Sequence, residues 1–155
     1  MSRQRWAAFA GLTAALALYT AGADRLWVAN PYYPDFGILG DGLEHQYLPG
    51  GTDTGETIDI HDTGGIQQAD GTYNGRTGML WQVNNGGDNC LFEMDPVTKV
   101  VTGNTICGPW TDPQNPVSQR GLAYDYATDT YYVGSTNSTV IYHIDSAGNP
   151  LDSAD

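Results

Sequence analysis

Aspartates in short turns are the residues of this sequence whose type and spacing could do chemistry. Two stretches, CLFEMDPVTKVVTG and VIYHIDSAGNPLDS, each end a short apolar run in an aspartate, Asp95 and Asp145. A carboxylate can serve as acid, base or nucleophile in glycoside hydrolysis, which needs two carboxylates around one bond. No pair stands out among the other candidates, which are Asp59, Asp62, Asp70, Asp88, Asp125 and Asp129.

The motifs of common hydrolases are missing from the sequence. The stretch HDTGG at 61–65 contains the DTG of aspartic proteases, but its flanking residues differ from that motif. No G-x-S-x-G accompanies the histidines, as a serine nucleophile would require in many hydrolases. His143 alternates with Tyr142 and Ile144, which is typical of a strand. We therefore expect neither a catalytic residue nor a cofactor in this chain.

Calcium is the metal for which the loops offer ligands. Asp88 in GGDN, and Asp125 and Asp129 in YDYATD, place oxygen donors close together. Hard cations need six to eight oxygens, and neither stretch has the spacing of an EF-hand loop. Asx turns explain the same residues, so the three aspartates are weak calcium candidates only.

The stretches around Asp95 and Asp145 belong to a repeat with an offset of about 50 residues. Trp81 aligns with Tyr131 without a gap, and each copy has a strand, a polar loop, a second strand and an Asp-led turn. An aspartate that begins a turn accepts hydrogen bonds from backbone N–H groups two residues on. We therefore predict that Asp95 and Asp145 cap turns. Trp81 and Tyr131 would then fill equivalent places in the packing of the two copies.

Composition and periodicity predict an all-β fold. The chain has 20 glycines and 10 tyrosines, and its turns are rich in Gly, Asp, Asn and Thr. Apolar residues at helical spacing are missing after the first two dozen positions. Short strands repeating every 50 residues or so suit the blades of a β-propeller. We predict two propeller-like blades in residues 71–155, and an irregular Gly- and Pro-rich segment with one or two strands in 24–70.

Residues 1–23 have the pattern of a secretory signal peptide. Two arginines precede an apolar run that closes on Ala21-Gly22-Ala23, as a cleavage site requires. The alternative is a membrane anchor, because the run just reaches spanning length. The net charge of −12 disfavours nucleic acids and anionic membranes as partners. We expect a secreted, acidic protein without a membrane anchor after cleavage.

Cys90 and Cys107 lie symmetrically about the DPVTK turn. If the flanking segments form a hairpin, the two cysteines lie nearly opposite each other. In an oxidising compartment this arrangement predicts a disulfide that closes the hairpin. The alternative is two free, buried thiols.

Within residues 78–145 the sequence resembles β-propeller repeat regions of secreted bacterial proteins. The shared elements are a W-x-V strand, GGDNC, a D-P-x-T turn, QRGLAYD and TDTYYVG. Lys99 and Tyr126 depart from it, where Gly and Pro are usual. Such regions often accompany subtilisin-like protease or other extracellular modules. The resemblance implies an extracellular propeller segment and carries no activity of a neighbouring domain.

We expect two to three blades in an incomplete ring, because closed propellers usually need four to eight. The chain would then be an N-terminal fragment with further blades or domains downstream; closure by self-association is the alternative. The expected role is non-catalytic binding or scaffolding toward an unidentified protein or glycan. The alternative is an accessory propeller of an extracellular hydrolase, such as a subtilisin-like protease, whose catalytic domain lies outside the chain. A more distant alternative is a propeller glycosidase.

Overall fold

The computed structural model describes residues 25–33, 38–61, 67–85, 90–108, 119–135 and 139–154. These residues form strands and turns and no helix, which confirms the predicted all-β class. In the part of the chain so described, no helix is long and apolar enough to cross a membrane. The predicted signal peptide at 1–23 and the calcium candidate Asp88 lie outside the described residues.

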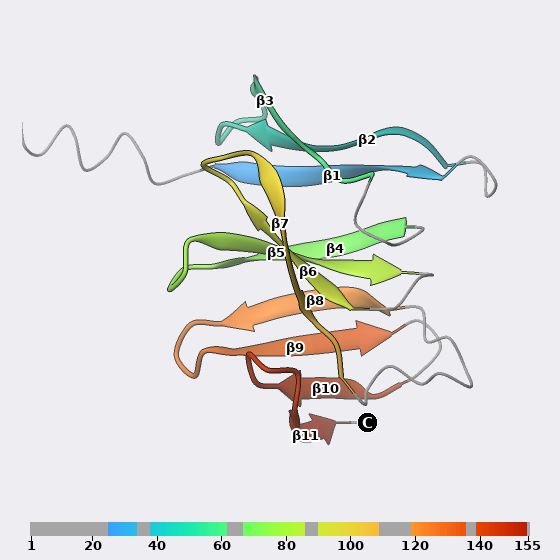
Figure 1. The fold of residues 1–155 in the computed structure, drawn as a ribbon, viewed down its shortest axis with the longest axis vertical. Helices are drawn as coiled ribbons and strands as arrows, with labels where there is room; N and C mark the ends of the chain where they lie inside the picture. The colour runs from blue at the N-terminus through green and yellow to red at the C-terminus, as the bar shows by residue number, and fades with distance from the viewer. Residues whose placement is uncertain are drawn as a thin grey trace, which may run out of the picture.

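The strands form three antiparallel sheets (Figure 1). Sheet A contains three strands, so the prediction of an irregular 24–70 segment with one or two strands was wrong. Sheets B and C each contain four strands in chain order. The strands are β1 (Leu26–Tyr33), β2 (Ile38–Tyr47) and β3 (Asp53–Asp59) in sheet A, β4 (Gln67–Asn74), β5 (Met79–Asn85), β6 (Leu91–Asp95) and β7 (Val100–Ile106) in sheet B, and β8 (Gln119–Asp125), β9 (Thr130–Ser135), β10 (Ile141–Ile144) and β11 (Pro150–Ala154) in sheet C.

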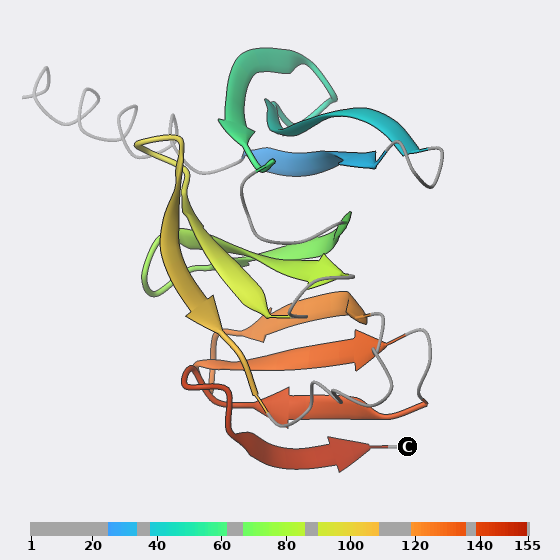
Figure 2. The ribbon, with the colours of Figure 1, turned by 45° about the vertical axis from the view of Figure 1, so that its right-hand side comes forward.

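Sheet B lies between the other two and buries both of its faces (Figure 2). Successive side chains of a strand point to opposite faces. On β5, Leu80 therefore packs toward sheet A with Phe92 and Met94, while Trp81 and Val83 pack toward sheet C. The core between sheets A and B also contains Ile58 and Ile60. The core between sheets B and C also contains Leu91, Ile106, Leu122, Tyr131, Val133 and Ile144.

The first strands of neighbouring sheets lie side by side, β1 next to β4 and β4 next to β8. Polar side chains of β4 join sheets B and C at this place. Asp70 Oδ2 accepts a hydrogen bond from the backbone N–H of Leu122 at 2.9 Å, and Thr72 Oγ1 accepts one from Tyr124 at 3.2 Å. Backbone groups on a strand edge thus find partners in the next sheet, as buried polar groups require.

One turn type recurs three times in sheets B and C. An Asn or Asp side chain accepts a hydrogen bond from the N–H two residues on, and the residue four positions after it has a positive φ. Asp145 also accepts such a bond, from Ala147 at 2.9 Å, but its turn has a different shape and includes Gly148 at φ 84°. The three turns begin at Asn74, Asp95 and Asp125, with hydrogen bonds of 2.9, 2.7 and 2.8 Å to the N–H groups of Arg76, Val97 and Ala127, and have Gly78, Lys99 and Asp129 at φ 79°, 64° and 61°.

Asp95 therefore occupies the predicted turn position, and its turn is matched in shape by that of Asp125. The sequence-matched Asp145 caps a turn of a different shape. Hydrogen bonds from the Val97 N–H and from Thr98 lower the pKa of the Asp95 carboxyl. Such bonds favour the charged form of a carboxylate. Lys99 adopts the positive φ for which glycine is usually preferred, so its departure from the repeat pattern leaves the turn type intact.

Trp81 and Tyr131 face each other across the interface between sheets B and C. Their ring centroids are 5.9 Å apart in an edge-on arrangement, so both do take part in the packing between sheets. The expectation of equivalent places was wrong. Leu80 pairs with Met94 as Tyr131 pairs with Ile144, so the residue equivalent to Trp81 is Tyr132. The gap-free alignment had shifted β9 by one residue, because its polar loop is one residue shorter.

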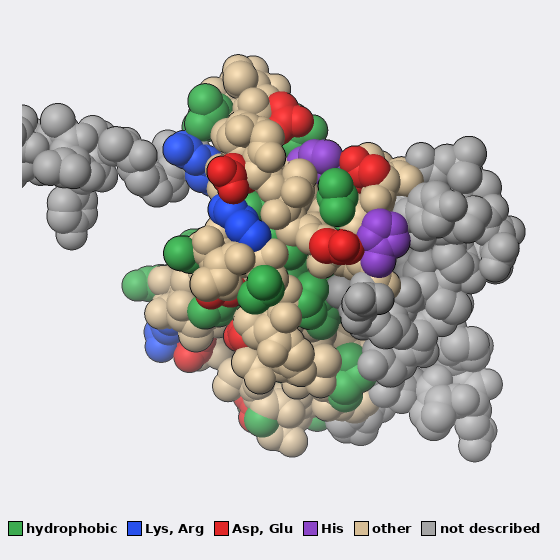
Figure 3. All heavy atoms as spheres, turned by 45° about the horizontal axis from the view of Figure 1, so that its top comes forward, with side chains coloured by type: hydrophobic (Ala, Val, Ile, Leu, Met, Phe, Trp, Pro, Cys, Tyr) green, Lys and Arg blue, Asp and Glu red, His purple; other side chains and the backbone are tan. Residues whose placement is uncertain are grey.

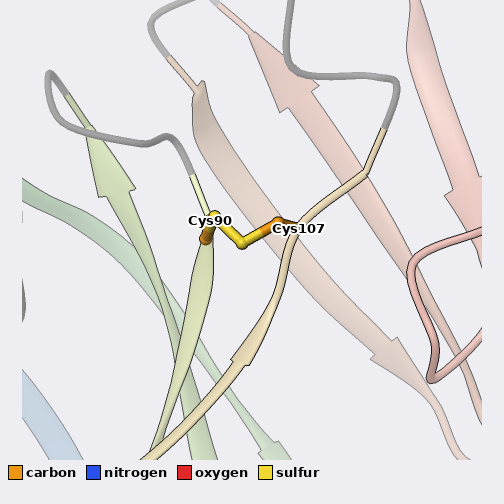
Figure 4. The surroundings of a disulfide bond; sticks show 2 residues. All are labelled: Cys90 and Cys107. Atoms are coloured by element: carbon orange, nitrogen blue, oxygen red, sulfur yellow. A yellow bond between two sulfur atoms is a disulfide. The ribbon is translucent and has the colours of Figure 1, made fainter.

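Cys90 and Cys107 form the predicted disulfide at the open end of the β6–β7 hairpin (Figure 4). Their Cα atoms are 4.5 Å apart, within the usual range for a bridge. The hairpin itself connects all three sheets, because its turn reaches sheet A and its open end lies beside sheet C (Figures 1 and 2). The bridge therefore fixes the element to which both neighbouring sheets are attached.

Candidate functional site

A cleft of about 670 Å³ lies between sheets A and B. Ligand sites are usually clefts of this size with apolar walls and a few convergent polar groups. Here β1, β2, β4 and β5 form the walls, and the β6–β7 turn contributes Pro96 and Val97. The lining also includes Arg25, Trp27, Ala29, Glu44, Asp70, Tyr73, Leu80, Gln82 and Met94.

Glu44 is the buried acid of this cleft. It lies on β2, where Gly42, Glu44 and Gln46 share the inward face and the residues between them are more exposed. Only 5% of Glu44 is exposed. Burial raises the pKa of its carboxyl to about 7, because removal from water penalises the charged form. This carboxyl can hold or release a proton near neutral pH.

Gln82 on β5 meets Glu44 from the opposite sheet. Its Nε2 donates to Glu44 Oε2 at 3.3 Å, the long end of hydrogen-bond distances. Gln82 is 1% exposed, and its Oε1 has no hydrogen-bond partner among the residues that the structure describes. An acceptor buried without a partner is costly, so such an atom is a candidate contact for a ligand or water.

Glu93, on β6 of sheet B, is a second buried carboxylate, and its hydrogen-bonding needs are met. Its Oε1 accepts from Thr102 Oγ1 and from Asn104 Nδ2, each at 2.8 Å. The irregular register between β6 and β7 brings these two donors to one oxygen. Glu44 receives a single long hydrogen bond from the described residues, so its site is built differently.

Charged and aromatic groups also connect sheet A to the β6–β7 turn. Lys99 Nζ lies 5.0 Å from the centroid of the Trp27 ring and 3.6 Å from Glu56 Oε2. These contacts attach the β6–β7 turn to sheet A, since a cation over an indole face is attracted to the ring. Elsewhere on sheet A, His45 and His61 each contact a carboxylate at 2.8 Å. Figure 3 shows such acidic and histidine side chains side by side.

The arrangement favours binding of hydrogen-bond donors over acid–base catalysis by a carboxylate pair. Asp70 also lines the cleft, but its two oxygens accept from the backbone N–H groups of Gly71 and Leu122, each at 2.9 Å. Asp70 is thereby used in joining β4 to β8. Asp70 is the only other carboxylate among the described lining residues, so the cleft does not offer there the two available carboxylates that glycoside hydrolysis needs.

The calcium candidates serve other contacts. Asp125 caps its turn, and Asp129 accepts from the Tyr124 hydroxyl at 2.7 Å. Asp129 Oδ2 also lies 3.7 Å from Arg76 Nη1. Among the residues with described positions, no group of three or more His, Cys, Asp or Glu side chains is placed to hold a metal ion.

His143 makes contacts that resemble a catalytic triad. Its Nε2 lies 2.7 Å from Thr130 Oγ1, and its Nδ1 lies 3.1 Å from Asp152 Oδ1. Thr130 is a buried residue, and His143 pairs laterally with Tyr132 and Asp152 across three strands. We interpret the group as a cross-strand ladder, in agreement with the expectation of a strand residue.

Sequence reasoning missed Glu44 and Gln82. The segment GLEHQY does alternate, but period-2 alternation leaves open which face is buried. Glu44 is separated from Gln82 by 38 residues and belongs to another sheet, so no local motif connects them. The polar alternation Gly42, Glu44, Gln46 was the available signal, and it points inward only in the folded chain.

Comparison with known proteins does not assign the chain to a family. No protein-family model matches the chain, and no curated protein matches it. The resemblance to propeller repeats stays a prediction.

Proposed function

We propose that this chain is an extracellular, non-catalytic binding segment of propeller type, and that the cleft between sheets A and B is its ligand site. The observation that carries the proposal is the cleft itself, with Glu44 and an unpartnered Gln82 acceptor at its base. The Cys90–Cys107 disulfide fits an oxidising compartment. Secretion through residues 1–23 belongs to the same proposal.

Continued stacking of sheets is supported by the outer face of sheet C. By strand register, Tyr132 and Ile141 occupy the positions that Trp81 and Leu91 occupy in sheet B. Trp81 and Leu91 are buried against the next sheet, whereas Tyr132 and Ile141 are 39% and 49% exposed. A further sheet of the same type would bury them, as in a propeller.

The test is a binding screen of the full chain against immobilised glycans and extracellular proteins, with one blocking variant. Ala29 lines the cleft and pairs with Glu44 on the inward face of sheet A, so Ala29→Trp should fill the cleft. Val100→Trp is the matched control, because Val100 is 50% exposed and does not line the cleft.

The proposal expects at least one ligand whose binding is lost in Ala29→Trp and retained in Val100→Trp, with both variants folded by circular dichroism. Binding that survives the blocking variant would place the site elsewhere. Hydrolysis of a bound glycan would overturn the non-catalytic role.

A further inference from the structure

The polar end of the cleft offers acceptors. Among the described residues, the only hydrogen bond to the Glu44 carboxyl comes from Gln82 Nε2, and Gln82 Oε1 receives none. If the Gln82 amide were rotated, Oε1 would face Glu44, and only a protonated Glu44 carboxyl could donate a hydrogen bond to it. Two adjacent acceptors on facing sheets thus call for a donor from outside.

The uncompensated charge of Glu44 and the negative net charge of the chain favour a cation as that donor. Arg25, which directly precedes β1, lines the cleft, and Asp70 and Tyr73 line it from β4. His45 follows Glu44 on β2. The whole chain carries a net charge of −12. A negative chain raises the local concentration of cations at its clefts. The ionised form of Glu44 lacks an ion-pair partner among the described residues, so a bound cation would compensate its burial.

We propose that the cleft binds a primary ammonium group on an aliphatic stem, such as a lysine side chain of a partner protein, with the ammonium donating to Glu44 and to Gln82 Oε1. This inference rests on the cleft being the site proposed above. An ammonium group carries three donors, enough for both acceptors. Trp27, Leu80 and Met94 give the stem an apolar wall.

Binding of the cation and protonation of Glu44 exclude each other, which gives the inference a pH signature. A positive charge at hydrogen-bond distance favours the ionised carboxylate, so binding releases the proton that burial retains. With a pKa of about 7 for the free Glu44 carboxyl, affinity should be about tenfold lower at pH 6 than at pH 8.

The experiment titrates the full chain with n-butylammonium and with n-butanol, following chemical shifts of β2 and β5 by NMR at pH 6 and pH 8. We expect n-butylammonium to bind the cleft, to bind about tenfold better at pH 8, and to bind at least about tenfold better than n-butanol. Glu44→Gln should abolish binding. Glu56→Gln, which changes an exposed carboxylate of sheet A, should retain it.

The source of the ammonium is distinguished by two further probes. Tighter binding of N-acetyl-lysine methylamide than of 1,5-diaminopentane supports a lysine side chain of a protein. The reverse order would overturn that source in favour of a free polyamine.

Three results would overturn the inference: equal affinity for n-butanol, binding that Glu44→Gln leaves unchanged, or no shift with either probe at millimolar concentration. Each is distinguishable from failure of the proposed function. That function fails when no ligand in the binding screen is sensitive to Ala29→Trp.

Discussion

The substitution Glu44→Gln should stabilise the protein at neutral and alkaline pH. Glu44 is 5% exposed and has one hydrogen bond of 3.3 Å to Gln82, so its ionised form is poorly compensated. Glutamine keeps the shape of the side chain and removes the charge. Its amide can also donate to Gln82 Oε1, the buried acceptor that has no partner.

The magnitude follows from the pKa difference between the folded and unfolded chain. Below pH 4.5 the carboxyl is protonated in both states and contributes no difference. Between pH 4.5 and 7 the unfolded chain releases the proton while the folded chain keeps it, so stability falls as pH rises. Above pH 7 the loss is constant at about 3 kcal/mol, which is the rise of the pKa from 4.5 to about 7 multiplied by about 1.4 kcal/mol for each pKa unit.

Urea unfolding of the wild type and Glu44→Gln between pH 4 and pH 8.5 measures this difference. The free energies of unfolding should coincide at pH 4, separate between pH 4.5 and 7, and then stay parallel, because all other acids cancel in the comparison. Glu56→Gln is the control and should show no such separation, since Glu56 is exposed. Parallel curves over the whole range, or a variant less stable at pH 8, would refute the burial argument.

Three further changes test the packing between sheets. Replacing Cys90 and Cys107 by serine should cost about 3 kcal/mol by the chain-entropy estimate for a loop of this length, measured by urea unfolding; an unchanged midpoint would contradict a stabilising bridge. Gly148→Ala should lower the melting temperature more than Gly55→Ala. Both glycines have a positive φ, but of the two only a Cβ at Gly148 would meet a neighbour, the Cys107 carbonyl oxygen at 2.8 Å. Equal effects would argue against this close approach. Arg76→Leu should cost about 1 kcal/mol in the same unfolding assay, because the Arg76 guanidinium donates to two carbonyls of the β8–β9 turn; Arg76→Lys recovering full stability would refute the forked contact.

The predictable part of this fold is local. The β6–β7 hairpin, its aspartate-capped turn and its disulfide follow from residues within one short stretch, since hairpin partners are close in sequence. The pairing of Leu91 with Ile106 agrees with the expected register near the cysteines. The shift between Phe92 and Met94 was not predicted, because it depends on Glu93 finding donors at Thr102 and Asn104.

The repeat was predictable, but its alignment in β5 and β9 was not. Leu80 and Trp81 are both large, as are Tyr131 and Tyr132, so residue type allows either alignment. Because side chains alternate with a period of two, a shift of one residue exchanges the faces of the whole strand. Only the pairing of Tyr131 with Ile144, and the contact of Tyr131 with Trp81, determine the correct one.

Sequence by itself determined the all-β class, the aspartate-led turns and the disulfide, because each depends on spacing within a few residues or on composition. Tertiary structure alone decided that β1–β3 form a sheet over sheet B, and that Glu44 on one sheet meets Gln82 on the next. The candidate site is formed where these two side chains come together. Burial raises the pKa of Glu44, and burial is a property of how faces are stacked, which no local pattern of residues specifies.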